Sequence, residues 1–138
     1  MTKKTVAYID GASRGNPGPA AVGVVFQDAA GHPLKKLSKT IGVTTNNTAE
    51  YAALIFAMQE AIMMGIKRLD VYTDSELVAK QFSGEYKIKE ASLKVLSLFV
   101  AHLKQGFEHV SLSHVPREKN KLADEQANLA LDQSEFFL

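Results

Sequence analysis

The sequence of 138 residues predicts an α/β fold in which a mixed five-stranded sheet is flanked by helices. Three segments typical of strands follow one another through short turns near the N-terminus, and such strands pair antiparallel. Further along, strand-like segments alternate with helical ones, and a strand that returns through a helix lies parallel to the one before it. The order is three strands, a helix, a strand, two helices, a strand and a helix, which together give a sheet with both types of pairing.

The first third of the chain carries the three antiparallel strands. Residues 5–10 alternate β-branched and aromatic residues, which is typical of a strand. Residues 11–19 contain three glycines and two prolines and are expected to form a turn-rich loop. Residues 21–27 and 34–43 are the second and third predicted strands, and the short segment between them has the composition of a turn.

The rest of the chain predicts helices that alternate with two more strands. Apolar residues are dense from residue 49 to 64, over about four helical turns, and this favours a largely buried helix. Leucine and valine at spacings of three and four predict an amphipathic helix over 91–104. Pro116 and Asn120 interrupt the chain before a last helix. The remaining elements are strands at 68–73 and 107–114 and a short helix at 75–82 that begins at Ser75.

The composition of the chain argues against several classes of protein. The chain contains 16 Lys and Arg against 15 Asp and Glu, a net charge of +1, which argues against a protein that coats nucleic acid through charge alone. No cysteine is present, which excludes disulfides, thiolate nucleophiles and cysteine-bound zinc or iron–sulfur sites. The most apolar stretch is shorter than the roughly 20 residues that a membrane span needs. We therefore expect a single domain over residues 1–138, located in the cytoplasm and not bound to a membrane.

An acidic residue lies at each of four junctions between predicted elements, and each has a local explanation. Asp10 begins a dipeptide that is common in turns, and residues 47–50 fit a capping box with Glu50 at its third helical position. Asp74 ends a strand beside a helix cap. Asp124, in the first turn of the last helix, complements the positive end of the helix dipole.

Taken together, the four acids predict a metal site. The carboxyl ends of parallel strands and the starts of adjacent helices face one crevice in an open sheet, so Asp10 and Asp74 are expected side by side there. Two carboxylates about 4 Å apart repel by about 4 kcal/mol at an effective dielectric constant of about 20, so such a cluster needs protons or cations. Carboxylate oxygens suit Mg²⁺ or Mn²⁺, and the histidines are too dispersed for a zinc set. The reaction class that this implies is phosphoryl transfer with two metal ions.

Four segments resemble the signature blocks of type 1 ribonuclease H, in the same order and along most of the chain: residues 8–20, 45–51, 72–75 and 114–124. The resemblance implies the ribonuclease H-like fold, with strand order 3-2-1-4-5. It also implies an endonuclease that hydrolyses the RNA strand of RNA-DNA hybrids and leaves 5′-phosphate and 3′-hydroxyl ends. The carboxylates that it assigns to two Mg²⁺ ions, with Mn²⁺ as the alternative, are Asp10, Glu50, Asp74 and Asp124.

The first two of these segments resemble those with which ribonucleases H contact the 2′-hydroxyls of RNA, the group that distinguishes RNA from DNA. Glycine and proline in residues 11–19 allow the backbone to approach a ligand closely, and hydroxyl and amide side chains donate and accept hydrogen bonds. A plain surface turn is the alternative interpretation of this loop. The candidate substrate-binding residues are Gly11, Ser13, Asn16, Asn46, Asn47 and Glu76.

Two features differ from many members of the family. His114 lies ten residues before Asp124, where members carry a histidine that assists catalysis, yet the loop that follows resembles a subgroup in which an arginine, here Arg117, takes this role. The alternatives are a structural histidine in the last strand, and an arginine that is a surface charge or a phosphate anchor. The chain also has no tryptophan. The basic protrusion that relatives carry between the fourth and fifth strands is therefore expected to be missing, and hybrid binding to be weak and salt-sensitive.

Two other functional classes stay open on the sequence alone. A nucleic-acid-binding or regulatory module could keep this fold without hydrolysing anything, and a metal phosphatase or another nuclease could use the same fold. All four carboxylates are present, which favours the enzyme, because a binding module gains nothing from acids that face phosphates. The expected partner is an RNA-DNA hybrid, and no obligate protein partner is indicated.

Overall fold

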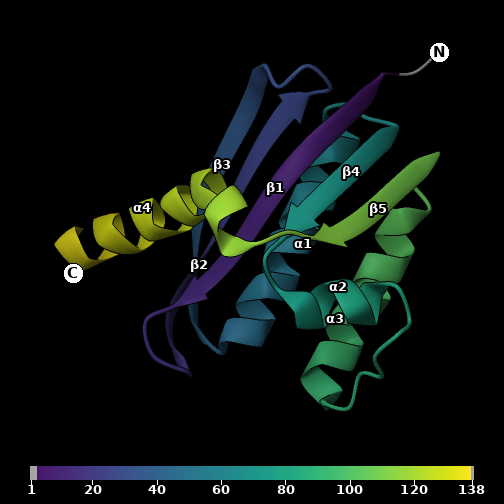
Figure 1. The fold of residues 1–138 in the computed structure, drawn as a ribbon. Coiled ribbons are helices and arrows are strands. Elements are labelled where there is room, and N and C mark those ends of the chain that lie inside the picture. The colour runs from purple at the N-terminus through teal and green to yellow at the C-terminus, as the bar shows by residue number, and fades with distance from the viewer. Residues whose placement is uncertain (1–2, 138) are drawn as a thin grey trace.

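The computed structural model describes the backbone of residues 3–137 and the side chains of residues 3–134. Its sheet has five strands in the order β3-β2-β1-β4-β5, as the resemblance predicted (Figure 1). β1 pairs antiparallel with β2, and β2 with β3, whereas β1 with β4 and β4 with β5 are parallel pairs. The mixed sheet is therefore confirmed. The strands are β1 (Lys4–Ser13), β2 (Gly18–Asp28), β3 (Pro33–Thr44), β4 (Arg68–Thr73) and β5 (His109–His114).

Helices cover both faces of this sheet. α1 packs against β1 and β2 on one face, with α3 against α1, while α4 crosses the opposite face over β1, β2 and β3 (Figure 1). Within the described residues, no helix combines the length and apolar character needed to cross a membrane. The helices are α1 (Asn46–Met63), α2 (Glu76–Phe82), α3 (Ala91–Lys104) and α4 (Lys121–Phe137), and a single 3₁₀ turn, η1 (Arg117–Lys119), precedes α4.

The first strand is longer than the sequence predicted, so the expected loop at 11–19 is wrong for its first three residues. β1 continues to pair with β2 until Ser13 lies opposite Ala20. Gly11 permits this because α1 lies directly against it. A Cβ atom at Gly11 would lie 2.1 Å from the carbonyl carbon of Ala49, so only glycine fits where the strand passes the helix.

The first helix begins earlier than residue 49, and the expected capping box with Glu50 at its third position is wrong. Thr45 is the N-cap, and its side-chain hydroxyl accepts a hydrogen bond from the backbone N–H of Thr48 at 3.2 Å. Glu50 consequently lies past the first turn, and its carboxylate is available for contacts with β1. The buried character predicted for this helix is confirmed, since alanines, Leu54 and Met58 are fully enclosed in the core.

Two further strand boundaries differ from the prediction by two residues or more. β2 begins at Gly18 rather than at residue 21, because its pairing with β1 and β3 extends into the glycine- and proline-rich segment. β5 begins at His109 rather than at residue 107. The backbone N–H groups of Glu108 and His109 both donate to the carbonyl of Lys67, and the ladder with β4 begins only where Arg68 pairs with His109.

The start of α4 is fixed to the centre of the sheet by a buried amide. Asn120 is fully enclosed, and its Nδ2 donates to the carbonyl oxygen of Ile9 at 2.8 Å. Further along, α4 lies directly on β2 at Gly23. A Cβ atom there would lie 2.2 Å from the carbonyl oxygen of Ala123, so the helix can approach the sheet this closely only over a glycine.

We predict that Gly23→Ala lowers the stability of the protein by about 1–3 kcal/mol, because the added methyl group must displace the backbone of α4. Thermal unfolding monitored by circular dichroism measures this change. Gly106→Ala is the matched control, because its new methyl group would meet chiefly the flexible end of the Ile62 side chain. Equal melting temperatures for the two variants would contradict the prediction.

Candidate active site

Three acidic side chains converge where β1 and β4 end. Asp10 is carried by β1, Glu50 by α1, and Asp74 by the residue that follows β4. One carboxylate oxygen from each lies within 4.8 Å of the others. Ile9 pairs with Thr73 in the parallel ladder, so the residues that follow these two lie side by side. The prediction that Asp10 and Asp74 meet at the carboxyl ends of parallel strands is therefore confirmed.

Glu50 is held in this cluster by β1 and β4. Its Oε1 accepts a hydrogen bond from the backbone N–H of Gly11 at 3.0 Å, and its Oε2 accepts one from the hydroxyl of Thr73 at 3.3 Å. Only 4% of the residue is exposed. Gly11 therefore positions Glu50 in two ways. Its lack of a side chain leaves room for α1, and its backbone N–H donates a hydrogen bond to the carboxylate.

Burial makes this cluster unfavourable for negative charge. Burial, followed by the charges of Glu50 and Asp74, raises the pKa of Asp10 far above its ordinary value. Burial also raises the pKa of Glu50, although the contacts with Asp10, Gly11 and Thr73 partly oppose this shift. These carboxyl groups therefore favour a bound proton or a cation close to them.

Asp124 reaches the same cluster from the opposite face of the sheet. It lies in the first turn of α4, as predicted, and its backbone N–H donates to the carbonyl of Asn120 at 3.2 Å. Its carboxyl group is one of the smaller causes, after burial, that raise the pKa of Asp10. Asp124 is half-buried and stands outside the tight group of three carboxylates.

All four carboxylates open into one cleft of about 390 Å³. Of the other residues proposed from the sequence, Gly11, Ser13, Asn46 and Arg117 line it. Arg117 is exposed and enters from η1. The full lining consists of Asp10, Gly11, Ala12, Ser13, Arg14, Asn46, Glu50, Asp74, Arg117, Asp124, Asn128 and Leu131.

The remaining candidates lie outside this lining. Asn16 supports the cleft indirectly, because its Oδ1 accepts a hydrogen bond from the backbone N–H of Asn46 at 3.0 Å. Asn47 is half-buried in the first turn of α1. Glu76 is the exposed first residue of α2, and His114 is the exposed last residue of β5.

Four lining residues were missed by reasoning from the sequence: Ala12, Arg14, Asn128 and Leu131. Asn128 follows Asp124 by four residues, and on a helix this spacing places two side chains on the same face. That spacing was the available signal for Asn128. Arg14 lies within the first signature segment, but its contacts with α4 join residues more than a hundred positions apart, which no local pattern reveals.

We predict that Asp10→Asn stabilises the metal-free protein at pH 8 and has little effect near pH 4. The raised pKa of Asp10 means that the folded state binds its proton more tightly than the unfolded state. The resulting stabilisation is complete below the ordinary pKa and is lost as the pH rises through the folded pKa, so an uncharged amide is favoured at high pH. A gain of about 1 kcal/mol would raise the melting temperature by roughly 3–6 °C at this chain length.

Thermal unfolding in a chelator at both pH values measures this effect. Asp28→Asn is the control, because the backbone N–H of His32 lowers the pKa of Asp28, and removing that charge should give no stabilisation at pH 8. A lower melting temperature for Asp10→Asn than for the wild type at pH 8 would show that the prediction is wrong.

Known proteins share this fold and much of this sequence. The reverse transcriptase-like family model matches residues 8–130. Ribonuclease HI of Halobacterium salinarum is 45% identical over 126 residues, which cover 91% of this chain and 63% of that protein. The crystal structure of RNase H1 from the same archaeon superposes with a TM-score of 0.92 at 44% identity, covering 94% of this chain and 98% of the other.

A structure with nucleic acid is also similar. LC11-RNase H1 in complex with an RNA/DNA hybrid has a TM-score of 0.90 and 43% identity, covering 94% of this chain and 98% of that chain. The chain spans 63% of the length of the Halobacterium salinarum relative and 36% of that of a Mycobacterium tuberculosis relative. A family match over most of the chain, on the fold and carboxylate cluster described above, shows that this protein belongs to the reverse transcriptase-like family, alongside the ribonucleases H.

Proposed function

We propose that this protein is a metal-dependent endonuclease that hydrolyses the RNA strand of RNA-DNA hybrids and leaves 5′-phosphate and 3′-hydroxyl ends. One observation carries the proposal: the carboxylates of Asp10, Glu50 and Asp74 meet in a cleft that Asp124 also lines. The similarity to LC11-RNase H1, whose structure contains an RNA/DNA hybrid, supports this choice of substrate. We also propose that residues 1–138 form a single ribonuclease H-like domain. The proposed location is the cytoplasm, and the proposal includes no obligate protein partner.

The residues of the cleft fit a divalent cation. The donor set consists of carboxylate oxygens, which Mg²⁺ and Mn²⁺ prefer, and burial raises the pKa of two of its members. We propose two Mg²⁺ ions, with Mn²⁺ as the alternative, held by Asp10, Glu50, Asp74 and Asp124. When bound, such ions supply positive charge that activates water and stabilises the leaving oxygen.

Other groups of the protein would hold the metal-binding carboxylates and the substrate phosphate in place. The Gly11 N–H and the Thr73 hydroxyl fix both oxygens of Glu50, so its carboxylate is oriented before any cation arrives. Arg117 lines the cleft from η1, and its guanidinium suits a phosphate oxygen. His114 is exposed and outside the lining, so we propose Arg117 rather than His114 as the assisting residue.

Recognition of RNA would come from the polar groups beside the carboxylates. Ser13 and Asn46 line the cleft and offer donors and acceptors to a 2′-hydroxyl. Asn16 orients the backbone of Asn46, and Gly11 also lines the cleft. Asn47 and Glu76, at the starts of α1 and α2, complete the proposed contacts.

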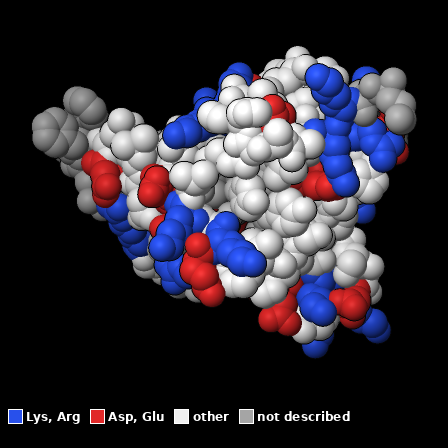
Figure 2. Space-filling view, turned by 45° about the horizontal axis from the view of Figure 1, so that its top comes forward, with Lys and Arg blue, Asp and Glu red and all other residues white. Residues whose placement is uncertain are grey.

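The DNA strand would follow the segment between α2 and α3, which has no helical protrusion of its own. A groove of about 520 Å³ there is lined by Tyr86, Lys87 and Lys89 among other residues. Lys80 is paired with Glu85, so part of the positive charge is neutralised. Figure 2 shows basic side chains in separate groups with uncharged surface between them, rather than one continuous basic track. These observations support our proposal that the protein belongs to the subgroup that lacks the protrusion, and the position of Arg117 in the cleft lining supports an assisting arginine in the loop before Asp124.

Asp10→Asn is expected to reduce Mg²⁺-dependent cleavage of a labelled RNA-DNA hybrid by more than roughly a hundredfold. Loss of a residue that only supports a metal ligand costs up to about a hundredfold, and Asp10 is proposed as a ligand itself. Gel analysis of the products measures this loss. Glu125→Gln is the matched control, because this exposed acid adjoins Asp124 but does not line the cleft. Cleavage retained by Asp10→Asn, or none by the wild type with Mg²⁺ or Mn²⁺, would refute the proposal, and binding without cleavage would indicate a regulatory module.

Lys87→Gln is expected to weaken binding equally for hybrids of different nucleotide sequence. It should also reduce the slope of the logarithm of affinity against the logarithm of salt concentration by about one. The reason is that one phosphate contact, with its released counterion, is lost. Fluorescence anisotropy with a labelled hybrid at several salt concentrations gives the slope. Lys36→Gln, on the edge strand β3, should leave the slope unchanged, and an affinity that does not respond to salt in the wild type would contradict the proposed path.

A further inference from the structure

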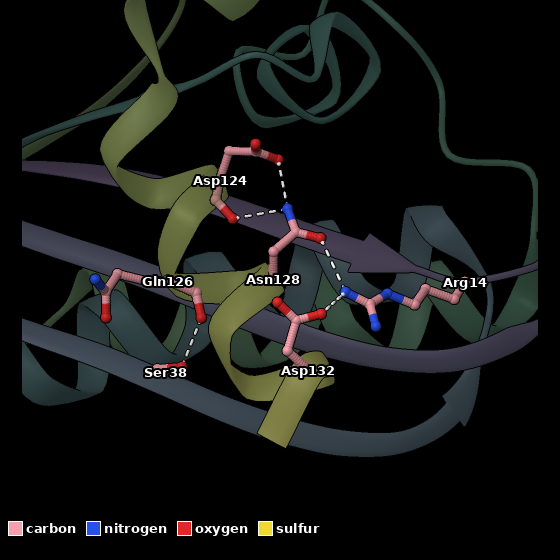
Figure 3. A network of polar contacts seen from close by, with 6 residues as sticks. All are labelled: Arg14, Ser38, Asp124, Gln126, Asn128 and Asp132. Atoms are coloured by element: carbon pink, nitrogen blue, oxygen red, sulfur yellow. Dashed lines mark hydrogen bonds and ion pairs between the residues drawn. The ribbon is translucent and has the colours of Figure 1, made fainter. Parts of the chain in front are cut away.

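Asp124 is held by a side chain of its own helix. The Nδ2 of Asn128 donates to the main-chain carbonyl of Asp124 at 3.0 Å and to its carboxylate Oδ1 at 3.2 Å (Figure 3). One amide therefore contacts both the backbone and the side chain of the same acid. A carboxylate that is bonded in this way has fewer orientations available to it than one that faces solvent.

The orientation of the Asn128 amide is set by a second contact. Nη2 of Arg14 donates to Oδ1 of Asn128 at 3.4 Å (Figure 3). A guanidinium has only donors, so the oxygen of the amide must face Arg14 and its NH₂ group must face Asp124. The arginine thereby determines that Asn128 acts on Asp124 as a donor.

Arg14 is itself held through both its side chain and its backbone. Its Nη2 also bonds to Oδ1 of Asp132 at 2.5 Å, one helical turn beyond Asn128 (Figure 3). Its backbone N–H donates to the carbonyl of Pro19 at 2.8 Å, across the link between β1 and β2. The guanidinium thus joins the residue after β1, next to the proposed RNA contact Ser13, to the helix that carries Asp124.

We propose that Asn128 is a positioning residue that orients the carboxylate of Asp124 for cation binding, and that Arg14 acts on Asp124 through Asn128. This inference rests on the proposed function only for the role of Asp124 as a metal ligand. A neutral amide suits the task, because it orients the carboxylate without adding a positive charge that would compete with a cation. Hydrogen-bond partners behind metal ligands typically account for a factor of about 10–100 in metal affinity or activity.

Asn128→Ala is expected to raise the dissociation constant for Mn²⁺, measured by calorimetry on the substrate-free protein, by roughly tenfold. The Mg²⁺ concentration that gives half-maximal hybrid cleavage should rise by a similar factor, while KM for the hybrid stays within about twofold. Gln126→Ala is the matched control, since it removes an amide from the same helix and retains the Cβ atom that faces Gly23. Asn128→Leu, which keeps the branching at Cγ but removes the amide, serves as a second variant if the alanine variant does not fold.

A double-mutant cycle tests the role of Arg14. Arg14→Met should weaken Mn²⁺ binding, and should have no further effect in the Asn128→Ala background, because its influence passes through the amide. Additive effects would overturn the role of Arg14. Mn²⁺ affinity equal to that of the wild type in both Asn128 variants would overturn the role of Asn128. If the wild type binds Mn²⁺ but cleaves no hybrid, the proposed function fails while the binding measurements still decide this inference.

Discussion

The repulsion between carboxylates that share a buried site is the constraint on which the local structure depends. Asp10 and Glu50 are almost fully enclosed, and Asp74 lies against both. The fold tolerates this arrangement by fixing the oxygens of Glu50 with groups from two strands and by leaving Asp74 and Asp124 partly open to the cleft. The same geometry leaves negative charge uncompensated, which only protons or cations can offset. Hydrogen bonds therefore hold the site on the side of Glu50, and the side of Asp74 and Asp124 is open to the cleft.

Sequence reasoning succeeded where one local rule decided the outcome. The alternation of strands and helices predicted a mixed sheet, and parallel pairing of the first and fourth strands brought Asp10 and Asp74 together. It failed where tertiary contacts outweighed local preference. The turn-forming composition after Asp10 predicted a loop, yet pairing with β2 and the close approach of α1 keep Gly11 in a strand. The hydroxyl of Thr45 caps α1, so the acid expected to cap it serves the site instead.

The net charge of +1 averages over two different environments. Four of the 15 acids line one cleft, and a pair of divalent cations there would neutralise them. Lysine and arginine side chains are spread over several parts of the surface in Figure 2. A nearly neutral sequence is thus compatible with a polyanionic substrate when the acids are gathered in one place. The absence of cysteine agrees with a site whose ligands are oxygens.

Because α4 is the last element of the chain, its docking is the last step of folding during synthesis. Synthesis delivers the chain from its N-terminus, and the five strands together with Asp10, Glu50 and Asp74 are complete before α4 emerges. The sheet can therefore assemble while its face over β1, β2 and β3 is still bare and its site has only three acids. Asp124 arrives when α4 settles on Gly23, with Asn120 bonded to Ile9. A nascent chain therefore lacks the fourth carboxylate of the cleft until the last helix has folded.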